Sequence, residues 1–172
     1  MDRREPSGDG SKNVLFVCTA NICRSPIAEA IFDALASDKG IPYESHSAGT
    51  AALVGEPIAP HARAALEEVG VYTDGHRARQ VDAAMLEEAD LVLAMTPRHV
   101  ETLRRISTVP PEKIRTLIGY ANGTPDLEGI PDPYGQTMAA YRASVRQIFE
   151  CVDRLVSKLK NDRTSRSETS RS

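Results

Sequence analysis

Five residues separate Cys18 from Arg24, and Ser25 and Pro26 follow directly. A loop of this length that runs into a helix N-terminus can turn successive backbone N–H groups inward and form a concave anion site. Arg24 can hold two phosphate oxygens with its planar guanidinium. The same positive field favours a thiolate, so Cys18 is predicted to be a nucleophile at neutral pH. The pattern therefore predicts attack of Cys18 on phosphorus and a phosphocysteine intermediate.

The other residues of the predicted phosphate loop have supporting roles. The loop comprises Thr19, Ala20, Asn21, Ile22, Cys23, Arg24 and Ser25. Asn21 tolerates a left-handed backbone better than most residues, which lets the loop close. Ser25 is expected to cap the following helix and to donate a hydrogen bond to the sulfur as it leaves. A single cysteine after a strand is usually a core residue, but the combined pattern favours catalysis.

The predicted loop lies between a strand and a helix. Residues 14–17 form a continuous apolar run, as expected for a strand buried on both faces of a parallel sheet. Apolar residues then recur at helical spacing from Ile27 to Leu35, with Pro26 at the first helical position. Further strands are expected at 43–48, 91–95 and 114–117, and further helices at 58–69, 82–88, 97–106 and 138–159. This alternation predicts one doubly wound α/β domain, which binds ligands at the carboxyl ends of its strands.

The length of 172 residues, with 41% hydrophobic and 26% charged residues, suits a single domain. We expect this domain at 13–160, between polar, disordered tails at 1–12 and 161–172.

The net charge of -3 argues against nucleic-acid and membrane-surface partners. An N-terminus without an apolar segment and an odd number of cysteines indicate a reducing, cytoplasmic location. We expect a monomer.

A loop rich in turn-forming residues, 121–135, precedes the last predicted helix. A carboxylic acid on this loop could protonate the leaving oxygen and later act as a base towards water. Asp126 and Asp132 both lie on it. Spacing alone does not choose between them.

From residue 13 to about residue 159 the chain resembles the low-molecular-weight protein tyrosine phosphatases. Their pattern C-x-G-N-x-C-R-S-P is matched by Cys18, Asn21, Cys23, Arg24, Ser25 and Pro26. The resemblance implies a four-stranded parallel sheet flanked by helices, a phosphorylated protein as substrate, no metal or other cofactor, and Asp132 as the general acid. Ala20 stands where the family commonly has glycine, which matters only if this position needs a positive φ.

The resemblance also implies residues around the loop. Ser47 and His76 would join Asn21 in hydrogen bonds that brace it. Leu53 and Tyr134, together with Ile22 of the loop, would form apolar walls of the substrate cleft. The remaining histidines show no metal-ligand spacing with the cysteines; they are His46, His61 and His99.

The substrate is a narrower question. Residues 47–50 and 89–96 resemble the bacterial branch of the family, which includes protein arginine phosphatases. Those enzymes tend to carry threonine where this chain has Ile22. An apolar side chain beside the bridging atom favours a phenyl ring, because the donors of a guanidinium would lose their partners on desolvation. We therefore predict phosphotyrosine as the substrate, with phosphoarginine as the alternative.

Two rival functions use the same loop. Thioredoxin-coupled arsenate reduction needs a relay of thiols, and no cysteine lies between Cys23 and Cys151. A non-catalytic phosphoprotein-binding module would need neither the thiol at Cys18 nor an acid at Asp132. Cys23 itself could resolve an oxidised Cys18 as a disulfide, or could simply pack as a small apolar residue.

Overall fold

Four parallel strands form one sheet in the order β2-β1-β3-β4, which confirms the predicted doubly wound fold. The computed structural model describes residues 12–169, and side-chain environments up to residue 164. The strands are β1 (Lys12–Cys18), β2 (Tyr43–Gly49), β3 (Leu91–Ala94) and β4 (Ile114–Thr116). The chain passes from β1 to β2 on one side and returns to β3 on the other. The carboxyl end of β1 is therefore a switch point, where sheets of this kind bind ligands.

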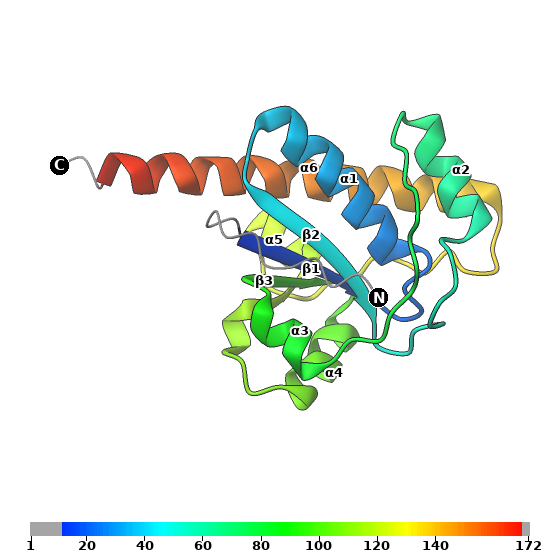
Figure 1. Ribbon diagram of the computed structural model, residues 1–172, viewed down its shortest axis with the longest axis horizontal. Helices are drawn as coiled ribbons and strands as arrows, with labels where there is room; N and C mark the ends of the chain where they lie inside the picture. Colours follow the sequence, from blue (N-terminus) through cyan, green and yellow to red (C-terminus); the bar gives the residue numbers. More distant parts are fainter. Residues whose placement is uncertain (1–11, 170–172) are drawn as a thin grey trace.

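Helices cover both faces of the sheet (Figure 1). One face carries α1 (Arg24–Lys39), α2 (Pro60–Glu68), α5 (Leu117–Asn122) and α6 (Met138–Thr169), and the other carries α3 (Ala83–Glu88) and α4 (Pro97–Ile106). A short 3₁₀ turn, Pro111–Lys113, leads into β4. Side chains alternate along β1, so that Phe16 packs in the core under α1 and α6 while Leu15 and Val17 pack in the core over α3 and α4. Both faces of the sheet are thus buried, as the apolar strand runs predicted.

The first helix begins two residues earlier than a cap at Ser25 would require. α1 starts at Arg24, and the capping residue is Cys23, whose side chain makes no capping hydrogen bond. Ser25 therefore lies inside the first turn, so the prediction that it caps the helix is wrong. Its hydroxyl is instead directed to Cys18 and Asn21.

In the C-terminal half, the end of β4 and the length of the last helix also differ from the prediction. The predicted strand at 114–117 ends at Thr116, whose hydroxyl accepts a hydrogen bond from Gly119 N–H and caps the unexpected helix α5. α6 continues to Thr169, past the expected domain boundary at 160, because extending a helix costs less than starting one. The expected tail at 161–172 therefore begins as helix. Residues 1–11 and 170–172, the rest of the expected tails, lie outside the described residues.

Within residues 12–169, no helix is long and apolar enough to cross a membrane.

The end of β2 is packed directly against the loop that follows β1. A Cβ added at Gly49 would lie 3.1 Å from Asn21 N and Asn21 Cβ, and closer still to the carbonyl oxygen of Thr19. These atoms are mostly backbone and cannot rotate away. The loop can keep its position only because residue 49 has no side chain.

We predict that Gly49→Ala displaces the loop, weakens binding of inorganic phosphate and costs about 1–3 kcal/mol of stability. Urea unfolding and calorimetric titration with phosphate measure the two effects. Gly40→Ala is the matched control, because Gly40 has a positive φ of 63° but open space around it. It should cost about 1 kcal/mol and leave phosphate binding unchanged. Equal phosphate affinity in the two variants would contradict the steric argument.

Candidate active site

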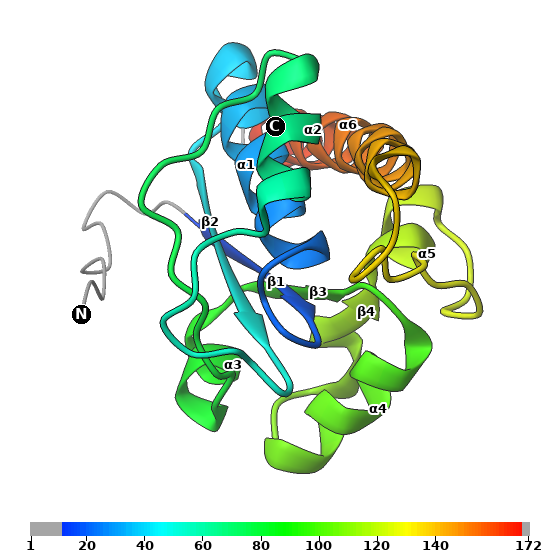
Figure 2. The same ribbon diagram turned by 90° about the vertical axis from the view of Figure 1, so that its right-hand side faces the viewer.

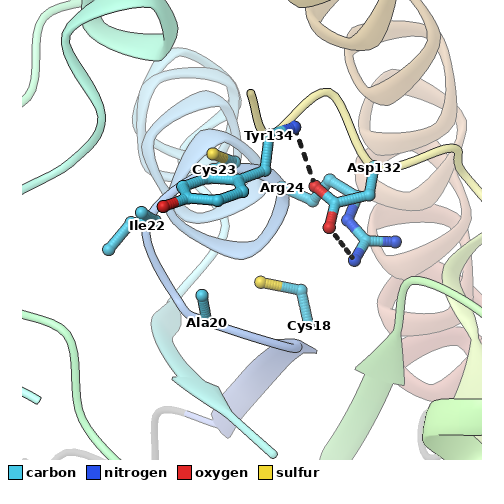
Figure 3. A pocket seen from close by; sticks show the side chains of 7 residues that line it. All are labelled: Cys18, Ala20, Ile22, Cys23, Arg24, Asp132 and Tyr134. Atoms are coloured by element: carbon cyan, nitrogen blue, oxygen red, sulfur yellow. Dashed lines mark hydrogen bonds and ion pairs between the residues drawn. The ribbon is translucent and has the colours of Figure 1, made fainter. Parts of the chain in front are cut away.

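A small hollow lies at the carboxyl end of β1, between the 18–25 loop and the segment that leads into α6 (Figure 3). Figure 2 shows the backbone of these two segments. It is lined by Cys18, Ala20, Ile22, Cys23, Arg24, Asp132 and Tyr134. Cys18 is the last residue of β1, and Arg24 is the first of α1. Asp132 and Tyr134 reach the hollow from more than a hundred residues further along the chain (Figure 3). The fold thus brings the three predicted catalytic side chains to one place.

The sulfur of Cys18 has a hydroxyl beside it. Cys18 Sγ lies 2.9 Å from Ser25 Oγ, and both residues are buried. Ser25 Oγ accepts a hydrogen bond from Asn21 Nδ2 at 2.8 Å. Its own proton is then free for the sulfur, since the other acceptor, the carbonyl of Ala48, lies 3.5 Å away. The arrangement suits a negatively charged sulfur.

Asn21 is the centre of a bracing network. It is the one described non-glycine residue with a positive φ, 62°, so Ala20 needs no glycine-like backbone. Its Nδ2 donates to Ser47 Oγ at 3.0 Å as well as to Ser25, and its Oδ1 accepts from the N–H of Arg79 at 2.9 Å. Its carbonyl oxygen accepts from His76 Nε2 at 2.7 Å. Ser47 and His76 therefore contact Asn21 in the way the resemblance implied.

His76 must donate to that carbonyl, because a carbonyl oxygen can only accept. Burial lowers the pKa of His76 against the opposing effect of this hydrogen bond, and the nearby guanidinium groups of Arg79 and Arg77 lower it further. A neutral ring with its proton on Nε2 fits both the lowered pKa and the hydrogen bond to the carbonyl of Asn21.

Arg24 is buried but not fully paired. Its Nη1 donates to the carbonyl of Ile130 at 2.9 Å, and its Nη2 lies 3.5 Å from Asp132 Oδ2. Its Nε is buried and has no hydrogen-bond partner among the described residues. An unsatisfied buried donor on a charged group is costly, and an anion in the hollow would satisfy it.

The two candidate acids have different surroundings. The side chain of Asp132 is about half exposed (48%), and its Oδ1 accepts from Tyr134 N–H at 3.1 Å. Asp126 lies outside the hollow, where it accepts hydrogen bonds from Arg115 Nε at 2.8 Å and from Thr116. Burial alone would raise the pKa of Asp126, but these hydrogen bonds outweigh it and lower that pKa. Asp126 therefore ties the 124–126 turn to the end of β4.

The cleft walls are only partly where we expected them. Ile22 and Tyr134 line the hollow, and the ring of Tyr134 extends over it (Figure 3). Leu53 does not line it, and its side chain is 44% exposed. Leu53 contacts the loop through its backbone, since its N–H donates to the carbonyl of Ala20 at 3.0 Å. The expectation that Leu53 forms a wall is therefore not met.

The other two thiols are buried. Burial raises the pKa of Cys23 to about 11, although the hydroxyl of Tyr141, 3.6 Å from its sulfur, acts in the opposite direction. Cys151 is buried in α6, away from the hollow, and burial also raises its pKa. In the described part of the chain, no three His, Cys, Asp or Glu side chains are grouped to hold a metal ion.

Several residues of the site had no signal in the sequence. His99 contacts Thr19 of the loop, Arg79 contacts Asn21 and Ser47, and Tyr141 contacts Cys23. Each of these contacts joins residues more than thirty positions apart. Only their place in the folded chain reveals them.

Comparison with known proteins agrees with this geometry. The family model described as low molecular weight phosphotyrosine protein phosphatase matches residues 13–165. A protein-arginine-phosphatase of Bacillus subtilis is 34% identical, over 88% of this chain and 99% of its own length. A low molecular weight protein-tyrosine-phosphatase of Streptomyces coelicolor is 41% identical, over 70% of this chain and 77% of its own.

Among solved structures, a low molecular weight protein tyrosine phosphatase from T. tengcongensis superposes with a TM-score of 0.80 and 37% identity. The match covers 86% of this chain and 99% of that one. Sequence and structure agree, and the chain belongs to the low molecular weight phosphotyrosine protein phosphatase family.

Proposed function

We propose that this chain hydrolyses phosphotyrosine in proteins through a cysteinyl-phosphate intermediate, with Cys18 as nucleophile, Arg24 as phosphate clamp and Asp132 as general acid. One observation carries the proposal: a buried guanidinium with an unpartnered Nε lies in the same hollow as a buried thiol and a half-exposed carboxyl group. A phosphate ester is the ligand that uses all three.

In the first step the phosphate dianion occupies the loop, where Arg24 and the backbone N–H groups at the start of α1 hold its oxygens. The sulfur of Cys18 attacks phosphorus, forming the S–P bond as the bond to the tyrosine oxygen breaks. The leaving oxygen takes a proton from Asp132, which becomes a carboxylate. Arg24 spreads the charge that develops on the phosphoryl oxygens.

In the second step water attacks the phosphocysteine and gives a proton to the Asp132 carboxylate. The S–P bond breaks, inorganic phosphate forms, and Cys18 leaves as a thiolate. The hydroxyl of Ser25, 2.9 Å away, stabilises that negative sulfur.

All the groups involved come from one chain, so we propose a monomer. Because a thiolate nucleophile has to stay reduced, we propose the cytoplasm as its location.

The phosphotyrosine preference rests on Ile22 and Tyr134, two large side chains with apolar surface that line the hollow. A phenyl ring gains from contact with such walls. Phosphoarginine is the second candidate, because the protein of Bacillus subtilis that is 34% identical is a protein-arginine-phosphatase. The guanidinium N–H donors of phosphoarginine would be desolvated against Ile22, whose side chain offers them no acceptor.

We predict that Cys18→Ser abolishes turnover of p-nitrophenyl phosphate while orthovanadate or phosphate still binds, because Arg24 and the loop remain. Steady-state kinetics and calorimetry measure the two properties separately. Turnover at the wild-type rate would show that another group attacks phosphorus.

We predict that Asp132→Ala slows hydrolysis of phenyl phosphate by about 10²–10⁴-fold but that of p-nitrophenyl phosphate much less, since nitrophenolate hardly needs a proton to leave. Asp126→Asn is the comparison variant. It should lower the unfolding free energy, through its lost pairing with Arg115, and change both rates equally. If Asp126→Asn instead shows the leaving-group dependence, the acid is Asp126.

We predict that Ile22→Thr shifts the ratio of kcat/KM towards a phosphoarginine peptide and away from a phosphotyrosine peptide. An exchange of this size is worth about 1–3 kcal/mol of discrimination. Ile22→Val is the matched control, because valine has the shape of threonine without its hydroxyl. If Val and Thr shift the ratio equally, size and not polarity sets the preference. A wild type that already prefers phosphoarginine would overturn the phosphotyrosine assignment.

A further inference from the structure

His99 lies beside the active site without a part in the steps above. It is buried in the first turn of α4, which follows β3. Its Nε2 lies 2.8 Å from Thr19 Oγ1, and its Nδ1 lies 2.9 Å from Thr96 Oγ1. Thr19 directly follows Cys18, and Thr96 caps α4. The ring therefore joins the phosphate loop to the end of β3.

This contact holds Thr19 from the side that the Asn21 network does not reach. The backbone of Thr19 is fixed from the β2 side, because its carbonyl oxygen accepts from Ala51 N–H at 2.9 Å. The carbonyl of Cys18 likewise accepts from Thr50 N–H at 2.9 Å. The side chain of Thr19 is fixed from the β3 side by His99. The residue after the nucleophile is thus clamped between the ends of the two strands that flank β1.

The charge state of the ring also bears on its neighbours. Burial and the Arg24 guanidinium lower the pKa of His99 to about 4, while the Asp132 carboxylate acts in the opposite direction. The ring is therefore neutral near pH 7, and one nitrogen donates while the other accepts. A charged ring would repel Arg24 and would favour the carboxylate form of Asp132, which cannot donate a proton. A neutral bridge holds the loop without disturbing either group.

We propose that His99 is a positioning residue of the phosphate loop, which acts as a neutral bridge from Thr96 to Thr19 and keeps the segment after Cys18 in its phosphate-binding shape. The inference rests on the proposed phosphatase mechanism. Binding of inorganic phosphate is therefore measured separately from turnover, so that failure of the mechanism and failure of the bridge can be told apart.

The experiment compares Thr19→Val, Thr19→Ser, His99→Gln and the double variant His99→Gln with Thr19→Val. Calorimetry gives the Kd for inorganic phosphate, and p-nitrophenyl phosphate gives kcat and KM. We expect Thr19→Val and His99→Gln each to raise the Kd by about three- to tenfold, and the double variant to be no worse than either, because both remove the same contact. Thr19→Ser keeps the hydroxyl and should bind phosphate like the wild type.

Thr102→Val controls for the loss of a threonine hydroxyl on α4, the helix of His99. Among the described residues, Thr102 Oγ1 bonds only within α4, to the carbonyl of Arg98. It should leave the Kd unchanged. The proposal is wrong if Thr19→Val binds phosphate within twofold of wild type, or if the effects of Thr19→Val and His99→Gln multiply in the double variant. If His99→Gln does not fold, the two Thr19 variants decide alone. A His99 ring that NMR shows to be mainly protonated at pH 7 would also contradict a neutral bridge.

Discussion

Asn21 keeps a left-handed backbone in the middle of the phosphate loop while it is completely buried, and the site depends on this turn. A non-glycine residue in this conformation costs about 1–2 kcal/mol. The cost is offset because the side-chain amide and the backbone carbonyl are both hydrogen-bonded, to partners on α1, on β2 and in the 76–79 segment. Four separate parts of the chain therefore meet at one residue. The loop is preorganised before any ligand arrives.

The second constraint is electrostatic. Arg24 is only 4% exposed, so its guanidinium has to be paired; it contacts the carbonyl of Ile130 and, at 3.5 Å, the carboxyl group of Asp132. This pairing is incomplete, since Nε has no partner within the described part of the chain. The fold therefore leaves part of the desolvation cost of the charge uncompensated by the protein, and a phosphate in the hollow would compensate it. Binding energy comes from groups that the fold has already buried.

The sequence predicted those parts of the site that are local. The strand, the loop and the helix from Val14 to Leu35 are contiguous, so apolar periodicity and the cysteine–arginine spacing sufficed to find them. Ser25 was misassigned as a cap, because a capping serine and a serine that faces a thiol look alike in sequence. Helix α5 was missed because six residues give too little periodicity. His99 and Tyr141 could not be found, since their contacts with the loop span 80 and 118 positions.

The contact between Cys23 and Tyr141 has a consequence for how fast the active site can form a disulfide. Thiol–disulfide exchange proceeds through the thiolate. Because burial raises the pKa of Cys23 to about 11, its thiol is almost entirely protonated at pH 7. Its sulfur is also buried, 3.6 Å from the hydroxyl of Tyr141. After an oxidant has attacked Cys18, we therefore expect closure of a bridge to Cys23 to be slow in the native loop, and to be faster when the packing around Tyr141 opens.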